Sequence, residues 1–339
     1  MKKNIFKFLT PFLVTALFAA APVFAQGRGS FHTDLDSALA AAKKSDKDLL
    51  IFITQEGEDK LSTSFMDSVC SQDLFGRITA SYEPVYMDFS QASFEKTVVH
   101  EGDSGEAQKK ANEAAESMQK NSRFAALINP EFTPAVYLFT REGYFVSHLV
   151  LKGDEDAAGF NKALSDDEVK LKALRQMIEK TKSGKALEKV AAIDVIFEAT
   201  QPEYRFFIID LVNEALSLDK KNKTGLMGKY LITRTEYDAM IAFYDNNAAS
   251  AVNAYVNAAK EKFLTAEEKQ QAYYMAALVM VKSSGPESLP MIVTYLEKSL
   301  AAAPKSANAG QIKENLDYFK DYQAKMNASS AEKTSGGKN

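Results

Sequence analysis

The chain has 339 residues, of which 46% are hydrophobic and 25% charged, and its formal net charge is −4. This length is sufficient for a sizeable core and for two domains. The mildly acidic balance excludes a general binder of nucleic acid or of anionic membranes, because both need a basic surface.

The first 25 residues have the pattern of a secretory signal peptide. Lys2 and Lys3 make the start basic, an apolar stretch follows, and the pattern Val23-Phe24-Ala25 predicts cleavage after Ala25. The apolar run is too short to span a bilayer, and no other apolar run reaches the ~20 residues needed. The sequence therefore predicts an exported protein, periplasmic or extracellular, without a stable membrane anchor.

The residues after the signal peptide alternate between helical and strand patterns. Helical spacing of apolar residues predicts a helix over 34–44. The apolar run DLLIFIT that follows predicts a fully buried strand. The next elements, in chain order, are a mostly helical stretch over 59–79, a strand over 84–89, a helix within 90–123, a strand that begins at Pro134 and a hairpin partner over 144–151. This order predicts a mixed sheet covered by helices, in a domain over 26–153.

From Asp154 onward the sequence contains no convincing strand pattern. Helices are predicted over 166–182, 186–199, 203–218, 224–245, 248–263, 266–283, 287–303 and 308–326. They form an all-helical domain of short hairpins over 154–327, and the polar tail over 328–339 is expected to be disordered. The segments NEALSLDKKNKTGL and EKSLAAAPKSANAG resemble the breaks between tetratricopeptide-type repeats, without a regular period.

Two segments, DSALAAAKKSDKDLLIFIT and FTPAVYLFTREGY, resemble an exported thioredoxin-like family over residues 31–152. The resemblance implies an α/β thioredoxin-like domain and a cis peptide bond between Thr133 and Pro134. It also implies that a polypeptide binds beside that bond. The sequence alone is equally compatible with a trans proline that opens a strand.

The chain departs from this family at the active site. Catalytic members carry Trp-Cys-x-x-Cys after the first strand, at a helix N-terminus that lowers the pKa of the first thiol. Here Gln55-Glu56-Gly57-Glu58-Asp59-Lys60 stands in that place. Carboxylates are favourable at a helix N-terminus, so this replacement suits folding and removes thiol–disulfide exchange.

Cys70 is the only cysteine, so two-cysteine redox chemistry within one chain, an intramolecular disulfide and a cysteine-based zinc site are all excluded. Helical spacing places Cys70 towards the buried face of its helix, as an inert core residue. The alternative is a single-thiol sensor or an intermolecular disulfide.

No metal or cofactor site is predicted. Glu56, Glu58 and Asp59 form a solvated, helix-capping turn, or else a cation site or a surface that recognises a partner; the loop lacks the spacing of an EF-hand. The three histidines are far apart and have no metal-ligand spacing, and motifs for phosphate binding or hydrolysis are missing from the sequence.

We therefore expect a non-catalytic polypeptide-binding or scaffolding protein, with no nucleic-acid partner. The expected partner-binding residues are Gln55, Glu56, Glu58, Asp59, Thr133 and Pro134. The alternatives are a redox protein that acts through Cys70 or within a thiol–disulfide relay, and a structural protein that forms oligomers through its helical domain. The sequence assigns no oligomeric state.

Overall fold

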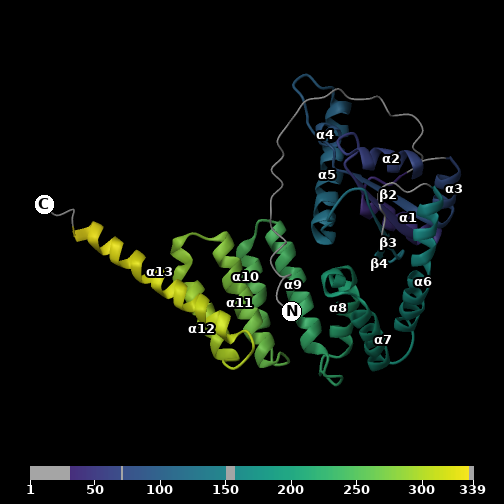
Figure 1. The fold of residues 1–339 in the computed structure, drawn as a ribbon. Coiled ribbons are helices and arrows are strands. Elements are labelled where there is room, and N and C mark those ends of the chain that lie inside the picture. Colours follow the sequence, from purple (N-terminus) through teal and green to yellow (C-terminus); the bar gives the residue numbers. More distant parts are fainter. Residues whose placement is uncertain (1–30, 70–71, 150–156, 336–339) are drawn as a thin grey trace. The chain divides into compact units, whose positions relative to one another are not determined.

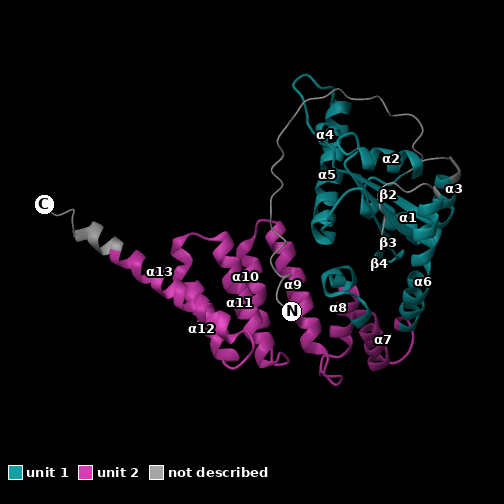
Figure 2. Ribbon diagram, in the orientation of Figure 1, with its two compact units in different colours: residues 1–180, 198–208 teal, residues 181–197, 209–339 magenta. Residues whose placement is uncertain are grey.

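The computed structural model describes residues 31–69, 72–149 and 157–335 (Figure 1). The predicted signal peptide, Cys70 and the predicted domain boundary after residue 153 lie outside these ranges. Within them, no helix is both long and apolar enough to cross a membrane. The chain divides into two compact units, here called the sheet unit (residues 1–180 and 198–208) and the helical unit (residues 181–197 and 209–339) (Figure 2).

The sheet unit is built on four strands in the order β2-β1-β3-β4. Their bounds are β1 (Asp48–Thr54), β2 (Tyr82–Asp88), β3 (Ala135–Phe139) and β4 (Phe145–His148). Strand β1 runs parallel to β2 and antiparallel to β3, and β3 pairs antiparallel with β4. All seven residues of β1 are buried, because this strand is central and both faces of the sheet are covered.

Helices connect and cover the strands of the sheet unit. They are α1 (Leu35–Ser45), α2 (Lys60–Val69), α3 (Gln72–Ser81), α4 (Gln91–Glu95), α5 (Gly105–Ile128) and α6 (Ala157–Thr181). The parallel pair β1–β2 needs a crossover connection, and the segment with α2 and α3 supplies it.

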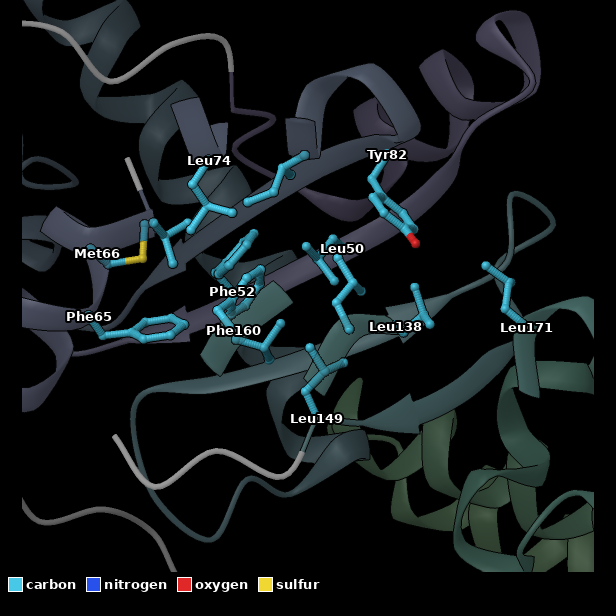
Figure 3. Close-up of a cluster of buried hydrophobic side chains, with 14 residues drawn as sticks. Leu50, Phe52, Phe65, Met66, Leu74, Tyr82, Leu138, Leu149, Phe160 and Leu171 are labelled. Atoms are coloured by element: carbon cyan, nitrogen blue, oxygen red, sulfur yellow. The ribbon is translucent and has the colours of Figure 1, made fainter. Parts of the chain in front are cut away.

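Successive residues of β1 point to opposite faces of the sheet, so each face has its own core. On one face Leu50 and Phe52 pack with Phe65 of α2 and Phe160 of α6 (Figure 3). The core of the other face contains Leu49, Ile51 and Phe139 of the sheet, together with side chains of α1 and α5; those of the helices are Ala38, Ala42, Phe124 and Ile128. The unbroken apolar run Leu49–Ile53 follows from this two-sided burial.

A short 3₁₀ helix, η1 (Pro202–Ile208), belongs to the sheet unit although it is remote in sequence. The ring of Tyr204 stacks on Phe145 with 3.7 Å between centroids. Phe207 meets Phe139 edge to face at 5.0 Å. Because η1 and α6 both add apolar side chains to the sheet, the compact unit extends past residue 153, where the sequence placed the domain boundary.

The helical unit contains the remaining elements. They are α7 (Ala186–Ala199), α8 (Ile209–Leu218), α9 (Met227–Tyr244), α10 (Ala248–Ala258), α11 (Ala266–Ser283), η2 (Pro286–Ser288), α12 (Leu289–Ala302) and α13 (Ala309–Ser335). From residue 157 to 335 the structure contains no strand. The predicted fold class, a mixed sheet flanked by helices and followed by an all-helical part, is confirmed.

The C-terminal helix is longer than the sequence pattern indicated. Helix α13 continues to Ser335, whereas disorder was expected from Ala328. Ile312 and Leu316 of α13 are buried, and these apolar contacts anchor its first half.

Candidate functional site

Three loops meet at one edge of the sheet. Strands β1 and β2 are parallel, so their last residues, Thr54 and Asp88, lie at the same edge, where they pair. Strand β3 begins there, because Ala135 pairs with Ile53. We call the loops that follow or precede these ends, residues 55–60, 89–104 and 129–134, the loop edge.

The peptide bond between Thr133 and Pro134 is cis, as the resemblance to the thioredoxin-like family implied. Pro134 is buried directly before β3. The hydroxyl group of Thr133 donates a hydrogen bond to Asp59 Oδ2 at 3.3 Å. Two predicted site residues that are 74 positions apart in sequence are therefore in contact.

Asp59 caps the N-terminus of α2. Its Oδ1 accepts a hydrogen bond from the backbone N–H of Leu61 at 3.0 Å. Its Oδ2 accepts from the backbone N–H of Ser62 at 3.1 Å and from Ser62 Oγ at 2.7 Å. Partial burial raises the pKa of Asp59, but the hydrogen bonds from Ser62, Leu61 and Thr133 outweigh it and hold this pKa below its usual range. Asp59 is thus a carboxylate at neutral pH, at the N-terminus of α2.

The other two acidic residues of the 55–60 loop, Glu56 and Glu58, accept hydrogen bonds from other parts of the sheet unit. The hydroxyl group of Tyr86 donates a hydrogen bond to the carboxylate of Glu56, which directs this side chain towards β2. Glu58 accepts a hydrogen bond from the backbone N–H of Gln91, the first residue of α4. The backbone carbonyl of Gln55 accepts from the N–H groups of Glu58 and Asp59, and so closes the turn.

The sequence reasoning missed a carboxylate at the end of β2. Asp88 accepts hydrogen bonds from Thr54 Oγ1 at 3.1 Å, from Ser90 Oγ at 2.5 Å and from Ser93 Oγ at 2.6 Å. It also accepts from the backbone N–H of Glu56 at 2.8 Å. The pattern Asp-x-Ser-x-x-Ser after the strand could have indicated such a capping cluster.

Tyr86 lies beside this cluster on β2. Its burial, the charge of Asp88 and the hydrogen bond to Glu56 all raise the pKa of Tyr86 above its ordinary value. Tyr86 therefore stays protonated and donates to Glu56. Within the described ranges, no three His, Cys, Asp or Glu side chains are placed to hold a metal ion.

Exposed apolar side chains concentrate at the loop edge and next to it. Six large apolar side chains of the described sheet unit are at least 40% exposed. Five of them lie in the loop edge or in the first turn of α2, and only Val169 of α6 lies elsewhere. The five are Leu61 (47%), Phe94 (44%), Val98 (49%), Val99 (44%) and Phe132 (50%). Scattered exposed apolar residues are ordinary, but their concentration on one part of a surface is typical of an interaction site.

The opposite edge of the sheet has a different polar cluster. Asp48, only 1% exposed, accepts a hydrogen bond from the backbone N–H of Arg141 at 2.9 Å and pairs with the guanidinium of Arg175. The hydroxyl group of Tyr82 donates to Glu168 at 3.1 Å. These pairs join α6 to the starts of β1 and β2, so we interpret the cluster as structural.

Replacing Asp59 is expected to destabilise the start of α2. In Asp59→Ala the N–H groups of Leu61 and Ser62 lose their acceptor, and such a cap contributes about 1 kcal/mol. We expect the free energy of unfolding, measured by urea denaturation, to fall by about that amount. Lys60→Ala changes an exposed residue of the same turn and is expected to have little effect. Equal destabilisation by both variants would show that Asp59 is not the cap.

We expect the half-buried side chain of His148 to make the folded protein less stable in acid. Its ring stacks on Tyr137 with 4.7 Å between centroids. Burial lowers the pKa of His148 below 6.5, although the charges of Glu131 and Asp167 oppose this shift. The unfolded chain therefore binds a proton first, and stability should fall as the pH drops below 6.5 towards the folded-state pKa.

The pH dependence of urea denaturation tests this expectation. His148→Gln should lose less stability between neutral pH and pH ~5 than the native chain does. His100→Gln, at an exposed position, should follow the native chain. An unchanged pH dependence in His148→Gln would contradict the assignment.

Cys70 lies outside the described residues, so the structure does not place it relative to the loop edge. A redox role through Cys70 stays a prediction from the sequence. Slow alkylation of the native protein, compared with the denatured protein, would contradict it, because a reactive thiol must be accessible.

The comparisons with known proteins show two similarities. A family described as "Uncharacterised protein C-terminal domain" matches residues 226–325, which lie within the helical unit. A Treponema pallidum (strain Nichols) protein named "Uncharacterized protein" is 24% identical over 302 residues, which cover 88% of this chain and 92% of that relative. The chain is therefore similar to this protein over a span that includes residues of both compact units.

Proposed function

We propose that this chain is an exported, non-catalytic member of the thioredoxin-like family, and that its loop edge binds an extended segment of another polypeptide. The observation that carries the proposal is the concentration of exposed apolar side chains at this edge. Burying them against a partner would remove apolar surface from water, which is the main driving force for association.

The backbone beside Pro134 supports an extended partner. Within the described part of the chain, the backbone N–H and C=O groups of Thr133 form no hydrogen bond. Such groups can pair with the main chain of an extended segment, as in strand addition to a sheet. In the thioredoxin-like family, a polypeptide partner binds at the corresponding place.

The chemistry of the site supports binding without catalysis. Asp59 takes the helix N-terminus that a nucleophilic thiol takes in catalytic members, and both of its oxygens accept hydrogen bonds from α2. A carboxylate in this role stabilises the helix and cannot exchange with a disulfide.

Site-specific cross-linking of the purified chain tests the proposal. A photoreactive phenylalanine analogue is placed at position 132 and, as a control, at position 169, which is also apolar and exposed in the sheet unit. The probe is an equimolar mixture of three labelled nine-residue peptides. Val alternates with Lys in the first peptide, with Ser in the second and with Glu in the third. We expect peptide adducts from position 132 and about tenfold fewer from position 169.

Two further variants connect the adducts to the apolar surface. Leu61→Ser should reduce the cross-linking from position 132, whereas Leu187→Ser, at an exposed position of the helical unit, should not. Equal adducts from positions 132 and 169, or none from either, would refute peptide binding at the loop edge.

A further inference from the structure

The loop edge carries an excess of negative charge larger than that of the whole chain. Its three loops contain seven carboxylates and two lysines, a net charge of −5, whereas the whole chain has −4. The carboxylates are Glu56, Glu58, Asp59, Glu95, Glu101, Asp103 and Glu131, and the lysines are Lys60 and Lys96. The remaining residues together are therefore close to neutral.

Several of these carboxylates are free to face a partner. Glu95, Glu101 and Glu131 are exposed, and they are interspersed with the exposed apolar residues of the same loops. Glu131 directly precedes Phe132, Glu95 directly follows Phe94, and Val99 is two residues before Glu101. The surface thus combines apolar contact area with an excess of negative charge.

We propose that the partner segment is basic: an extended stretch in which Lys or Arg alternates with apolar residues. This inference rests on the proposed function and adds the chemistry of the partner to it. Apolar side chains of the segment would pack on residues such as Phe132 and Val98, while its cations would neutralise the surrounding carboxylates. Charge complementarity of this kind sets specificity and the rate of association, and an acidic segment would be repelled.

Other occupants fit the charge less well. A second copy of this chain, if it paired through the same edge as symmetric dimers do, would bring two surfaces of net charge −5 together. A nucleic acid would be repelled for the same reason. A divalent cation lacks a site, because no three suitable ligands lie together in the described ranges.

The affinities of the three peptides, measured separately, test whether the loop edge prefers a basic segment. Binding of each labelled peptide to the purified full chain is followed by fluorescence anisotropy at salt concentrations of about 0.05 M and about 0.5 M. We expect the Val–Lys peptide to bind at least about tenfold more tightly than the Val–Ser peptide at low salt, and the Val–Glu peptide to bind most weakly. The difference should shrink at high salt, because exposed charges are screened.

Variants that remove negative charge test whether the preference for the Val–Lys peptide comes from the carboxylates of the loop edge. Combining Glu95→Gln, Glu101→Gln and Glu131→Gln should weaken binding of the Val–Lys peptide about fivefold and leave the Val–Ser peptide unchanged. The matched control combines Glu261→Gln, Glu267→Gln and Glu314→Gln, which remove the same charge from exposed positions of the helical unit. This control should bind like the native chain.

The outcomes are distinguishable. Equal affinity for all three peptides would overturn the basic partner and leave the proposed function in place. No binding of any peptide would overturn both. An equal loss in the two triple variants would show that the preference comes from the charge of the whole chain and not from the loop edge, which also contradicts the inference.

Discussion

Phe139→Ala is expected to lower the free energy of unfolding by about 3–5 kcal/mol, because it removes a fully buried aromatic ring and leaves a cavity. Phe139 is 0% exposed. Its ring lies 5.6 Å from the rings of Phe124 and Phe145 and 5.0 Å from that of Phe207. It therefore joins β3 to α5, to β4 and to η1, so one substitution removes contacts with three elements of the sheet unit.

Urea denaturation followed by circular dichroism measures the effect. The control is Phe94→Ala, since Phe94 is 44% exposed at the loop edge, and we expect it to change stability by less than about 0.5 kcal/mol. Phe207→Ala should destabilise the chain in the same direction as Phe139→Ala, by a smaller amount, because Phe207 is only partly buried. A native-like Phe207→Ala variant would contradict the packing of η1 on the sheet.

Asp48→Ala is the second substitution with a large expected effect, about 2–3 kcal/mol of destabilisation. It leaves the backbone N–H of Arg141 and the guanidinium of Arg175 without the acceptor that they share. Arg175 is 40% exposed, so solvent screens part of the loss and the expected effect lies below that of a fully buried pair.

Asp48→Asn separates the hydrogen bonds from the charge. Burial raises the pKa of Asp48, and the charge of Arg175 and the hydrogen bonds from Arg141 and Arg175 only partly oppose it. The ionised form therefore has no net advantage over a neutral acceptor. An asparagine can still accept from Arg141, so Asp48→Asn should cost much less than Asp48→Ala in the same urea measurement. Equal losses would show that the charge itself is required.

Much of the fold was predictable because local sequence and burial agree. The apolar run of β1 needs two covered faces, and the structure provides them. The helical periodicities after residue 184 correspond to α7–α13. Pro202 begins η1, and Pro304 lies between α12 and α13. The predicted, mostly helical stretch 59–79 corresponds to α2 and α3.

The site was predictable only in part. A residue pattern and a resemblance placed Asp59 and Thr133 at the same site, and the hydrogen bond between them agrees with that placement. The roles of Glu56 and Glu58 were not accessible in this way, because their neighbours Tyr86 and Gln91 come from a different strand and helix. The turn Gln55–Lys60 is accordingly a set of separate contacts and not one acidic cluster.

The sequence by itself excluded one kind of chemistry and indicated most of the helices and strands. A single cysteine excludes intramolecular dithiol exchange whatever the fold, and the periodicity of apolar residues depends only on local geometry. The tertiary structure decided which loops share an edge, that η1 completes the sheet unit, and that the loops with the exposed apolar side chains and carboxylates adjoin the same strand ends. These features depend on strand direction and on contacts between residues distant in sequence, which no local pattern encodes.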